Sequence, residues 1–192
     1  GENRIDVWDN RAAAIDDFSR ALAVIQQYID VQFTYLGEFD DPIAAGQAGA
    51  DLVYTLDNTV SDDGTLAYAY FPGPGVFSTE KYASEGGDVF MNYSEDIIAT
   101  SSFEYGSDGF VTIVHEIGHA LGLKHPFVVS GGRPSVETMG RDDIIDVDWM
   151  TVMSYTDPFE SELERFDPAT PMVLDVLALQ FIYGANSETN AG

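Results

Sequence analysis

Three histidines and a glutamate in the segment 115–125 have the types and spacing of a metal site. The segment reads His115-Glu116-Ile117-Gly118-His119-Ala120-Leu121-Gly122-Leu123-Lys124-His125. On a helix, positions i and i+4 share one face, so His115 and His119 can bind one metal ion together. Gly122 can end the helix and turn the chain sharply, which lets His125 return as a third ligand. The spacing therefore predicts a site with three imidazole ligands.

The chemistry that suits this ligand set is catalysis by one Zn²⁺ ion. Three neutral imidazoles leave a fourth coordination position open, as in catalytic rather than structural zinc sites. Glu116 projects about 100° round the helix from His115, because an α-helix has about 3.6 residues per turn. From there its carboxylate can reach a water on the metal without being a ligand. All three histidines of the chain lie in this segment, so the general-base role goes to Glu116.

Several elements must position this motif, and the first half of the chain alternates between helical and strand-like patterns. Apolar residues at spacings of three and four predict a first helix, with Asp9 or Asn10 as its cap: Ile15, Phe18, Leu22, Ile25 and Ile29. Runs rich in β-branched or aromatic residues predict strands at 31–35, 51–56, 66–71 and 88–93, with a further strand at 5–8. These patterns therefore predict a mixed sheet with helices in this half of the chain.

The second half of the chain is predicted to be largely irregular. The motif lies on a second helix from about Phe110 to Leu121, which stops at Gly122. Residues 124–157 show no long period. A third helix follows, with Thr170 as its cap, Pro171 in its first turn and Gly184 at its end. Its apolar stripe is Leu174, Leu177, Ala178, Phe181 and Ile182. The overall prediction is an α+β fold whose irregular C-terminal half is closed by a helix.

Composition excludes several classes of protein. Among 192 residues, 33 are acidic and 8 basic, which gives a net charge of −25, while 45% are hydrophobic and none is cysteine. A core can form, but no disulfide or thiolate metal site can. A surface this negative repels phosphate backbones, which argues against nucleic-acid binding. We interpret the charge as a sign of an extracellular or high-salt setting; the less favoured interpretation is that it attracts cationic substrates or calcium. No apolar stretch reaches the length of a membrane helix, and Gly1-Glu2-Asn3-Arg4 does not begin a signal peptide.

Further segments carry a family resemblance. Pro126 follows the third histidine, and Met153-Ser154-Tyr155 is similar to the methionine turn of the metzincin peptidases. Three further segments resemble segments of one family within that clan: Ala67 to Gly73, Gly87 to Asn92, and Asp175 to Asn186. Within that clan the chain resembles the serralysin family; matrixins share the zinc motif but have different neighbours around the third histidine and the methionine turn. The resemblance implies a bacterial, secreted protein with one metzincin-like catalytic domain over 1–192, divided into subdomains of about 1–122 and 123–192.

The resemblance also implies roles for individual residues. His115, His119 and His125 would bind zinc, Glu116 would be the general base, and Met153 would form a hydrophobic floor beneath the metal. Tyr155 would be an extra ligand or would stabilise the transition state; the alternative is an ordinary half-buried aromatic residue. Gly87, Asp88, Val89 and Phe90 would lie on a strand edging the cleft, where a substrate peptide pairs through backbone hydrogen bonds.

The leading hypothesis is a secreted zinc endopeptidase of broad specificity, which uses a zinc-bound water activated by Glu116. One alternative is a processing protease within a larger secreted RTX-type protein or adhesin, and another is a non-catalytic acidic binding module. Walls of the substrate pocket are expected around Pro126 to Arg133 and Asp148 to Tyr155. A protein inhibitor is a further partner compatible with the resemblance. Calcium is the other candidate ion, but the acidic segment Arg141 to Asp148 lacks EF-hand spacing and is interpreted as a solvated loop.

Overall fold

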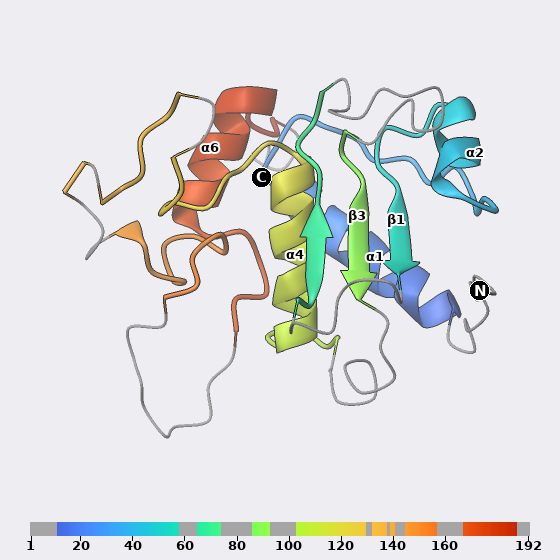
Figure 1. Ribbon diagram of the computed structural model, residues 1–192, viewed down its shortest axis with the longest axis horizontal. Coiled ribbons are helices and arrows are strands. Elements are labelled where there is room, and N and C mark those ends of the chain that lie inside the picture. Colours follow the sequence, from blue (N-terminus) through green and yellow to red (C-terminus); the bar gives the residue numbers. More distant parts are fainter. Residues whose placement is uncertain are drawn as a thin grey trace.

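The computed structural model describes residues 11–57, 65–73, 86–92, 103–129, 132–137, 139–140, 145–156 and 167–187. The helices are α1 (Arg11–Gln26), α2 (Pro42–Gln47), α4 (Asp108–Ala120) and α6 (Val173–Tyr183), and the strands are β1 (Tyr54–Asp57), β2 (Ala67–Ala69) and β3 (Val89–Asn92). This arrangement confirms the α+β class (Figure 1). The predicted strand at 5–8 and the cap at Asp9 or Asn10 lie outside the described residues.

The sheet is mixed, and its strands lie in the order β1-β3-β2. β3 pairs with β1 in parallel, with Tyr54 opposite Val89, and with β2 antiparallel, with Tyr68 opposite Phe90. β3 therefore has a hydrogen-bonded neighbour on each side. The prediction that Gly87 to Phe90 edges the cleft is wrong in this respect, because strand-like patterns predict strands but not their order. In the described part of the sheet, β2 is the outer strand on the side of α4.

Side chains of β2 alternate between the two faces of the sheet, as the period of two requires. Ala67 and Ala69 pack against the hydrophobic core. On the other face Tyr68 stacks on Phe90 with ring centroids 4.9 Å apart, and Tyr70 meets Phe90 edge-on. Small side chains on the inner face let the helix that carries the histidine motif lie close to this strand.

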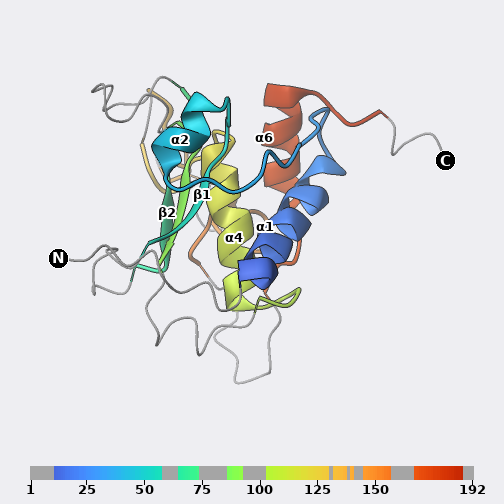
Figure 2. The same cartoon turned by 90° about the vertical axis from the view of Figure 1, so that its right-hand side faces the viewer.

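Helix α4 is the central element of the core. It lies between α1 and the sheet, and Figure 2 shows both helices on the same face of the sheet. The Ser107 side chain accepts a hydrogen bond from the Phe110 amide and caps the helix start. The helix ends before Gly122, whose φ of +102° is in the left-handed region that favours glycine. The predicted helix and its stop are confirmed, and its buried apolar side chains include Phe110, Ile113, Val114 and Ile117.

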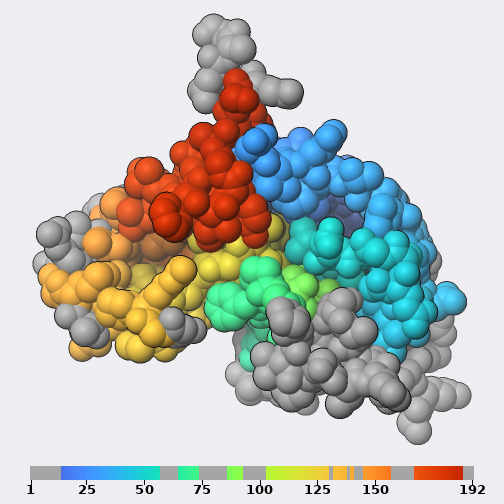
Figure 3. Space-filling view, turned by 90° about the horizontal axis from the view of Figure 1, so that it is seen from above, coloured from blue at the N-terminus to red at the C-terminus, as the bar shows by residue number. Residues whose placement is uncertain are grey.

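Helix α6 begins later than predicted, with Met172 rather than Thr170 at its N-cap. The Asp175 carboxylate sets this start, because it accepts a hydrogen bond from the Met172 amide. The predicted apolar stripe faces the core only in part: Ala178 packs against it, but Leu177 and Phe181 are 59% and 88% exposed, whereas Asp175 and Leu179 are buried. Figure 3 shows the helix at the surface, in red, between the segment that follows α1 and the C-terminal irregular region.

The segment after α1 also differs from the prediction. Residues 31–39 form no strand, although the Phe33 amide donates to the Gln26 side chain. The short helix α2 was not predicted, because its apolar pattern is too brief to show a period; the Asp41 carboxylate caps it. The end of α1 is joined to the end of α6 through an isolated bridge between Ile29 and Ala185. No helix in the described residues is long and apolar enough to span a membrane.

Candidate metal centre

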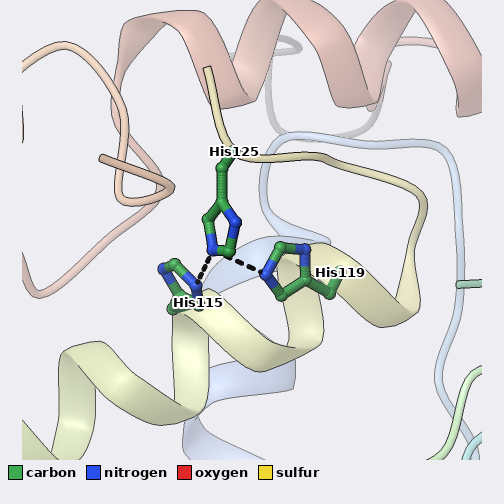
Figure 4. A group of neighbouring side chains, drawn as sticks. All are labelled: His115, His119 and His125. Atoms are coloured by element: carbon green, nitrogen blue, oxygen red, sulfur yellow. Dashed lines mark hydrogen bonds between the residues drawn. The ribbon is translucent and has the colours of Figure 1, made fainter. Parts of the chain in front are cut away.

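The three histidines of the motif converge on one point. His115 and His119 project from one face of α4, and His125 returns toward them from the segment that follows the Gly122 turn (Figure 4). The Nε2 atom of His125 lies 3.1 Å from Nε2 of His115 and 3.1 Å from Nε2 of His119. In the described part of the chain these side chains form a group that could hold a metal ion, and their ligand atoms all lie within 4.8 Å of one another.

The donor set fits zinc in chemistry and in spacing. A tetrahedral zinc with Zn–N bonds of about 2.0–2.1 Å needs its nitrogens roughly 3.4 Å apart, close to the observed separations. The other ring nitrogens of two ligands are already engaged: Nδ1 of His115 lies 2.7 Å from the Val152 carbonyl oxygen, and Nδ1 of His119 lies 2.8 Å from that of Leu123. A carbonyl can only accept, so each Nδ1 donates. The Nε2 lone pairs therefore face the centre of the site.

The environment keeps the imidazoles in the neutral form that binds metals. Burial lowers the pKa of His115 to about 3. Burial, together with neighbouring His119 and Lys124, lowers the pKa of His125 to about 4, and burial also lowers the pKa of His119. Protons therefore do not compete strongly with a metal ion for these nitrogens near neutral pH.

Glu116 is a buried carboxyl beside this cluster. It is 6% exposed, and its Oε2 atom has no hydrogen-bond partner among the described residues. Burial raises its pKa to about 8. A buried acceptor without a partner is costly, and a nearby cation with its water would offset that cost. This orphaned oxygen is an independent sign that the three imidazoles are arranged to hold a metal ion.

Tyr155 reaches the same point from the C-terminal half. Its hydroxyl oxygen lies 2.9 Å from Nε2 of His125, and its ring stacks against that of His115 with centroids 5.5 Å apart. Burial of the hydroxyl raises the pKa of Tyr155, and the negative charge of the Glu116 carboxylate raises it further. The phenol therefore stays protonated and can donate a hydrogen bond into the site.

Met153 packs beneath the helix that carries the ligands. Its side chain is 2% exposed, and its sulfur would lie 2.8 Å from a Cβ atom added at Gly118. Glycine at this position of α4 therefore leaves the space that the Met153 side chain fills.

Asp175 is a site residue that sequence reasoning missed. Its carboxylate is buried and accepts hydrogen bonds from the hydroxyl of Thr151, the amide of Val152 and the amide of Met172, the two amide bonds being 2.8 Å long. Through Val152 it is linked to the ligand His115. The available signal was a carboxylate within the otherwise apolar sequence of α6, where a charge is expected on the exposed face.

Two phenylalanines contact the cluster: Phe71 was missed, whereas Phe127 lies in the segment around Pro126 to Arg133 that was expected to wall the substrate pocket. Phe71 follows β2 and meets the His119 ring edge-on, with centroids 5.6 Å apart. Phe127 stacks on His125 with centroids 4.9 Å apart and an interplanar angle of 7°. Because an aromatic residue in a loop has no periodicity, only the folded arrangement of the chain places Phe71 beside His119.

The predicted residues Gly87 to Phe90 lie just before and at the start of β3, and the histidine cluster does not include them. Gly87 donates its amide to the Tyr70 carbonyl, and Asp88 is buried at the start of β3. In the acidic segment, Asp142 and Asp143 lie outside the described residues. The Asp146 carboxylate accepts a hydrogen bond of 2.6 Å from the Ser154 hydroxyl, so this acidic group supports the segment before Tyr155.

Comparisons with known proteins agree with this site. The family model described as matrixin matches residues 5–131. Serralysin C of Dickeya chrysanthemi is 37% identical over 136 residues, which cover 68% of this chain and 26% of that protein. Serralysin of Proteus mirabilis is 32% identical over 155 residues, which cover 79% of this chain and 30% of that protein. Metalloprotease AprA of Pseudomonas entomophila is 27% identical over 196 residues, which cover 94% of this chain and 39% of that protein.

The chain thus spans between a quarter and two fifths of the length of these relatives. The matrixin match includes all three histidines of the cluster, which could bind the one zinc ion on which that family depends. The chain therefore belongs to the serralysin family of metzincin zinc peptidases, as a catalytic domain that the matrixin family model also matches.

Proposed function

We propose that this chain is the catalytic domain of a secreted endopeptidase that hydrolyses peptide bonds in protein substrates. The observation that carries the proposal is the convergence of three Nε2 atoms beside the buried, unpartnered carboxyl oxygen of Glu116. Three neutral imidazoles with an adjacent carboxylate make up the ligands and base of a hydrolytic zinc site. The two parts of the domain, about 1–122 and 123–192, each contribute ligands to it.

Each residue has one role in this proposal. Zinc, when bound, supplies a Lewis acid that polarises a peptide carbonyl and lowers the pKa of a water molecule. Glu116 takes the proton from the attacking water and delivers it to the leaving amine. The Tyr155 hydroxyl donates a hydrogen bond to the oxygen that becomes negative in the transition state. Met153 fills the space beneath α4 and holds the ligands in place without touching the substrate.

The outer edge of β2, with which no other strand of the described residues pairs, is the proposed binding site for the substrate backbone. The Leu66 carbonyl and the Tyr70 backbone form hydrogen bonds with β3, so the alternate residues Ala67 and Ala69 direct their backbone groups away from β3. A peptide that pairs there adds a strand to the sheet. Since Phe71 follows the strand and contacts His119, such a peptide leads to the histidine cluster. This edge replaces the 87–90 segment as the proposed backbone-binding strand.

The decisive experiment compares the zinc-loaded protein with its Glu116→Gln variant. Mass spectrometry of a peptide digest should show cleavage by the wild-type protein and none above background by the variant, while both hold one zinc ion per chain. Glu137→Gln is the matched control, because it removes an exposed carboxylate from the irregular segment and should leave cleavage unchanged. A variant with near-normal turnover would contradict the role of Glu116.

The same digest separates the alternatives. Cleavage of many unrelated proteins supports a broad endopeptidase, whereas cleavage confined to one partner, or to a longer form of this chain, supports a processing protease. A zinc-loaded protein that cleaves no peptide in a diverse library would instead indicate a non-catalytic binding module.

A further inference from the structure

Tyr155 is 71% exposed, although its hydroxyl oxygen lies 2.9 Å from Nε2 of His125. A side chain with so much exposed surface has little packing to hold it, so its position depends on the backbone that carries it. We infer that Asp146 is a positioning residue for Tyr155: through Ser154 it fixes the backbone on both sides of the phenol and thereby keeps the hydroxyl at the histidine cluster. This inference rests on the proposed peptidase function and adds to it a residue outside the cluster.

The Ser154 side chain links the residues before and after Tyr155. Its hydroxyl donates a hydrogen bond of 2.6 Å to the Asp146 carboxylate, and its oxygen accepts one of 3.0 Å from the amide of Thr156. Since a hydroxyl has a single proton, the carboxylate decides where that proton points and leaves a lone pair for the amide. Ser154 is only 7% exposed, so little water reaches the hydroxyl to replace either partner. The backbone of Tyr155 therefore runs between two positions that one hydroxyl holds together.

Asp146 can act in this way because its own segment is fixed. The next residue, Val147, is buried, and its carbonyl accepts hydrogen bonds from two amides of the following turn, at 2.9 and 3.2 Å. The amide of Asp148 donates to the Thr156 carbonyl at 3.1 Å, which ties the same segment to the residue after Tyr155. The two segments are thus joined by a side-chain contact and a backbone contact, and a substitution at Asp146 removes only the first.

A second carboxylate holds the other end of segment 151–156. Asp175 binds the amide of Val152, and the Val152 carbonyl faces the ligand His115. Asp175 therefore orients a metal ligand, whereas Asp146 holds the part of the segment from which the phenol projects. This division gives a distinguishing expectation, because loss of the Asp146 contact should weaken catalysis while zinc affinity stays the same.

The size of the effect follows from the proposed role of the phenol. Removing a hydrogen-bond donor that stabilises charge in the transition state lowers kcat by about 100-fold or more, which is the loss expected of Tyr155→Phe. Asp146→Ala keeps the phenol but lets its backbone move. We therefore expect a loss in kcat of about tenfold with KM little changed, because the hydrogen bond acts in the transition state. Once Tyr155→Phe has removed the hydroxyl, adding Asp146→Ala should cost nothing further in kcat.

The test measures kcat and KM of the zinc-loaded protein on one cleaved peptide, for Asp146→Ala, for Tyr155→Phe and for the two substitutions combined. Ser154→Ala removes the hydroxyl that Asp146 binds and should match Asp146→Ala. Asp146→Asn keeps an acceptor oxygen and should restore most of the lost activity. Asp40→Ala is the matched control, because Asp40 is an exposed aspartate in the segment before α2 and its removal changes the net charge equally.

A second measurement needs neither zinc nor substrate. NMR of the metal-free protein with isotope-labelled tyrosine rings reports on the 10 tyrosines of the chain, and Tyr155→Phe identifies the signal of Tyr155. In Asp146→Ala and in Ser154→Ala that signal should move toward the position of a tyrosine in an unfolded chain, because the ring leaves its histidine neighbours. In Asp40→Ala the signal should stay where it is.

The outcomes separate this inference from the proposed function. If the zinc-loaded wild type cuts no peptide, the proposed function fails, and the NMR signal alone decides whether Asp146 holds the ring. If the wild type cuts but Asp146→Ala and Ser154→Ala keep its kcat, or if the losses multiply in the combined variant, only the positioning inference fails. A merely structural role would lower stability but leave kcat of the folded, zinc-loaded protein and the Tyr155 signal unchanged. If Asp146→Ala does not fold, Ser154→Ala carries the same test.

Discussion

The Nδ1 atom of His115 lies 2.7 Å from the carbonyl oxygen of Val152, which is 37 residues further along the chain. The amide of Val152 is in turn held by the buried carboxylate of Asp175 at 2.8 Å. A ligand on α4 is therefore oriented by a carboxylate on α6, through one peptide unit between them. Such support around a metal ligand sets ring orientation and basicity.

Asp175→Ala should destabilise the protein and weaken zinc binding. The substitution leaves the buried amide of Val152 and the partly buried amide of Met172 without their acceptor, which predicts a loss of about 2–4 kcal/mol in the free energy of unfolding. Zinc affinity should fall by about 10–100-fold. Urea denaturation of the metal-free protein and zinc titration against a competing chelator measure the two effects. Asp175→Asn keeps one acceptor oxygen, so its unfolding free energy and zinc affinity should fall less than those of Asp175→Ala. If the wild type and both variants had the same stability and zinc affinity, the proposed link from Asp175 to His115 would be contradicted.

Gly118→Ala should destabilise the protein, although alanine normally favours helices. Helix propensity alone predicts a gain of about 1 kcal/mol for this change. The new Cβ atom, however, would lie 2.8 Å from the Met153 sulfur, and overpacking in a core costs about 1–3 kcal/mol. Thermal or urea unfolding of the variant and the wild type shows directly whether the free energy of unfolding rises or falls. Combining Gly118→Ala with Met153→Ala should recover part of the overpacking cost, and a simple gain in the single variant would show that Met153 moves aside freely.

The stability of the metal-free protein should depend on pH through Glu116. Burial raises its pKa to about 8, well above the value of the unfolded chain. A carboxyl with a raised pKa stabilises the folded state below the unfolded pKa, and this contribution is lost as pH rises through about 8. The free energy of unfolding of wild type, compared with Glu116→Gln, should therefore fall between about pH 5 and pH 9. A constant difference over that range would show that Glu116 is not desolvated.

Zinc should stabilise the protein through all three histidines. Ligand binding to the folded state alone adds about 2.7 kcal/mol when free zinc is 100 times its Kd. Calorimetry with added zinc, and again with a chelator in excess, should show the melting temperature rise and then return. His125→Ala should remove most of the rise, since two imidazoles remain. A full zinc-dependent rise in that variant would place the metal elsewhere.

Local patterns predicted much of the scaffold. The helix α4 and its stop at Gly122 follow from apolar spacing and from a glycine that tolerates positive φ, although the cap at Ser107 was not predicted and the helix begins at Asp108 rather than at about Phe110. The order of the strands does not follow from local patterns, because each strand-like run can pair on either side. That is why the expected edge strand was placed on β3, whose position between β1 and β2 depends on contacts distant in sequence. The start of α6 likewise depends on a hydrogen bond from Met172 to Asp175.

The sequence by itself determined the ligand set, since His115 and His119 are one helical turn apart and a glycine turn precedes His125. These are relations within eleven residues, where backbone geometry alone decides which side chains meet. Only the tertiary structure decided what surrounds that set: the Val152 carbonyl on His115, the carboxylate of Asp175 behind it, and the two phenyl rings beside the site. Those contacts join segments tens of residues apart, and packing and burial, rather than local spacing, bring them together.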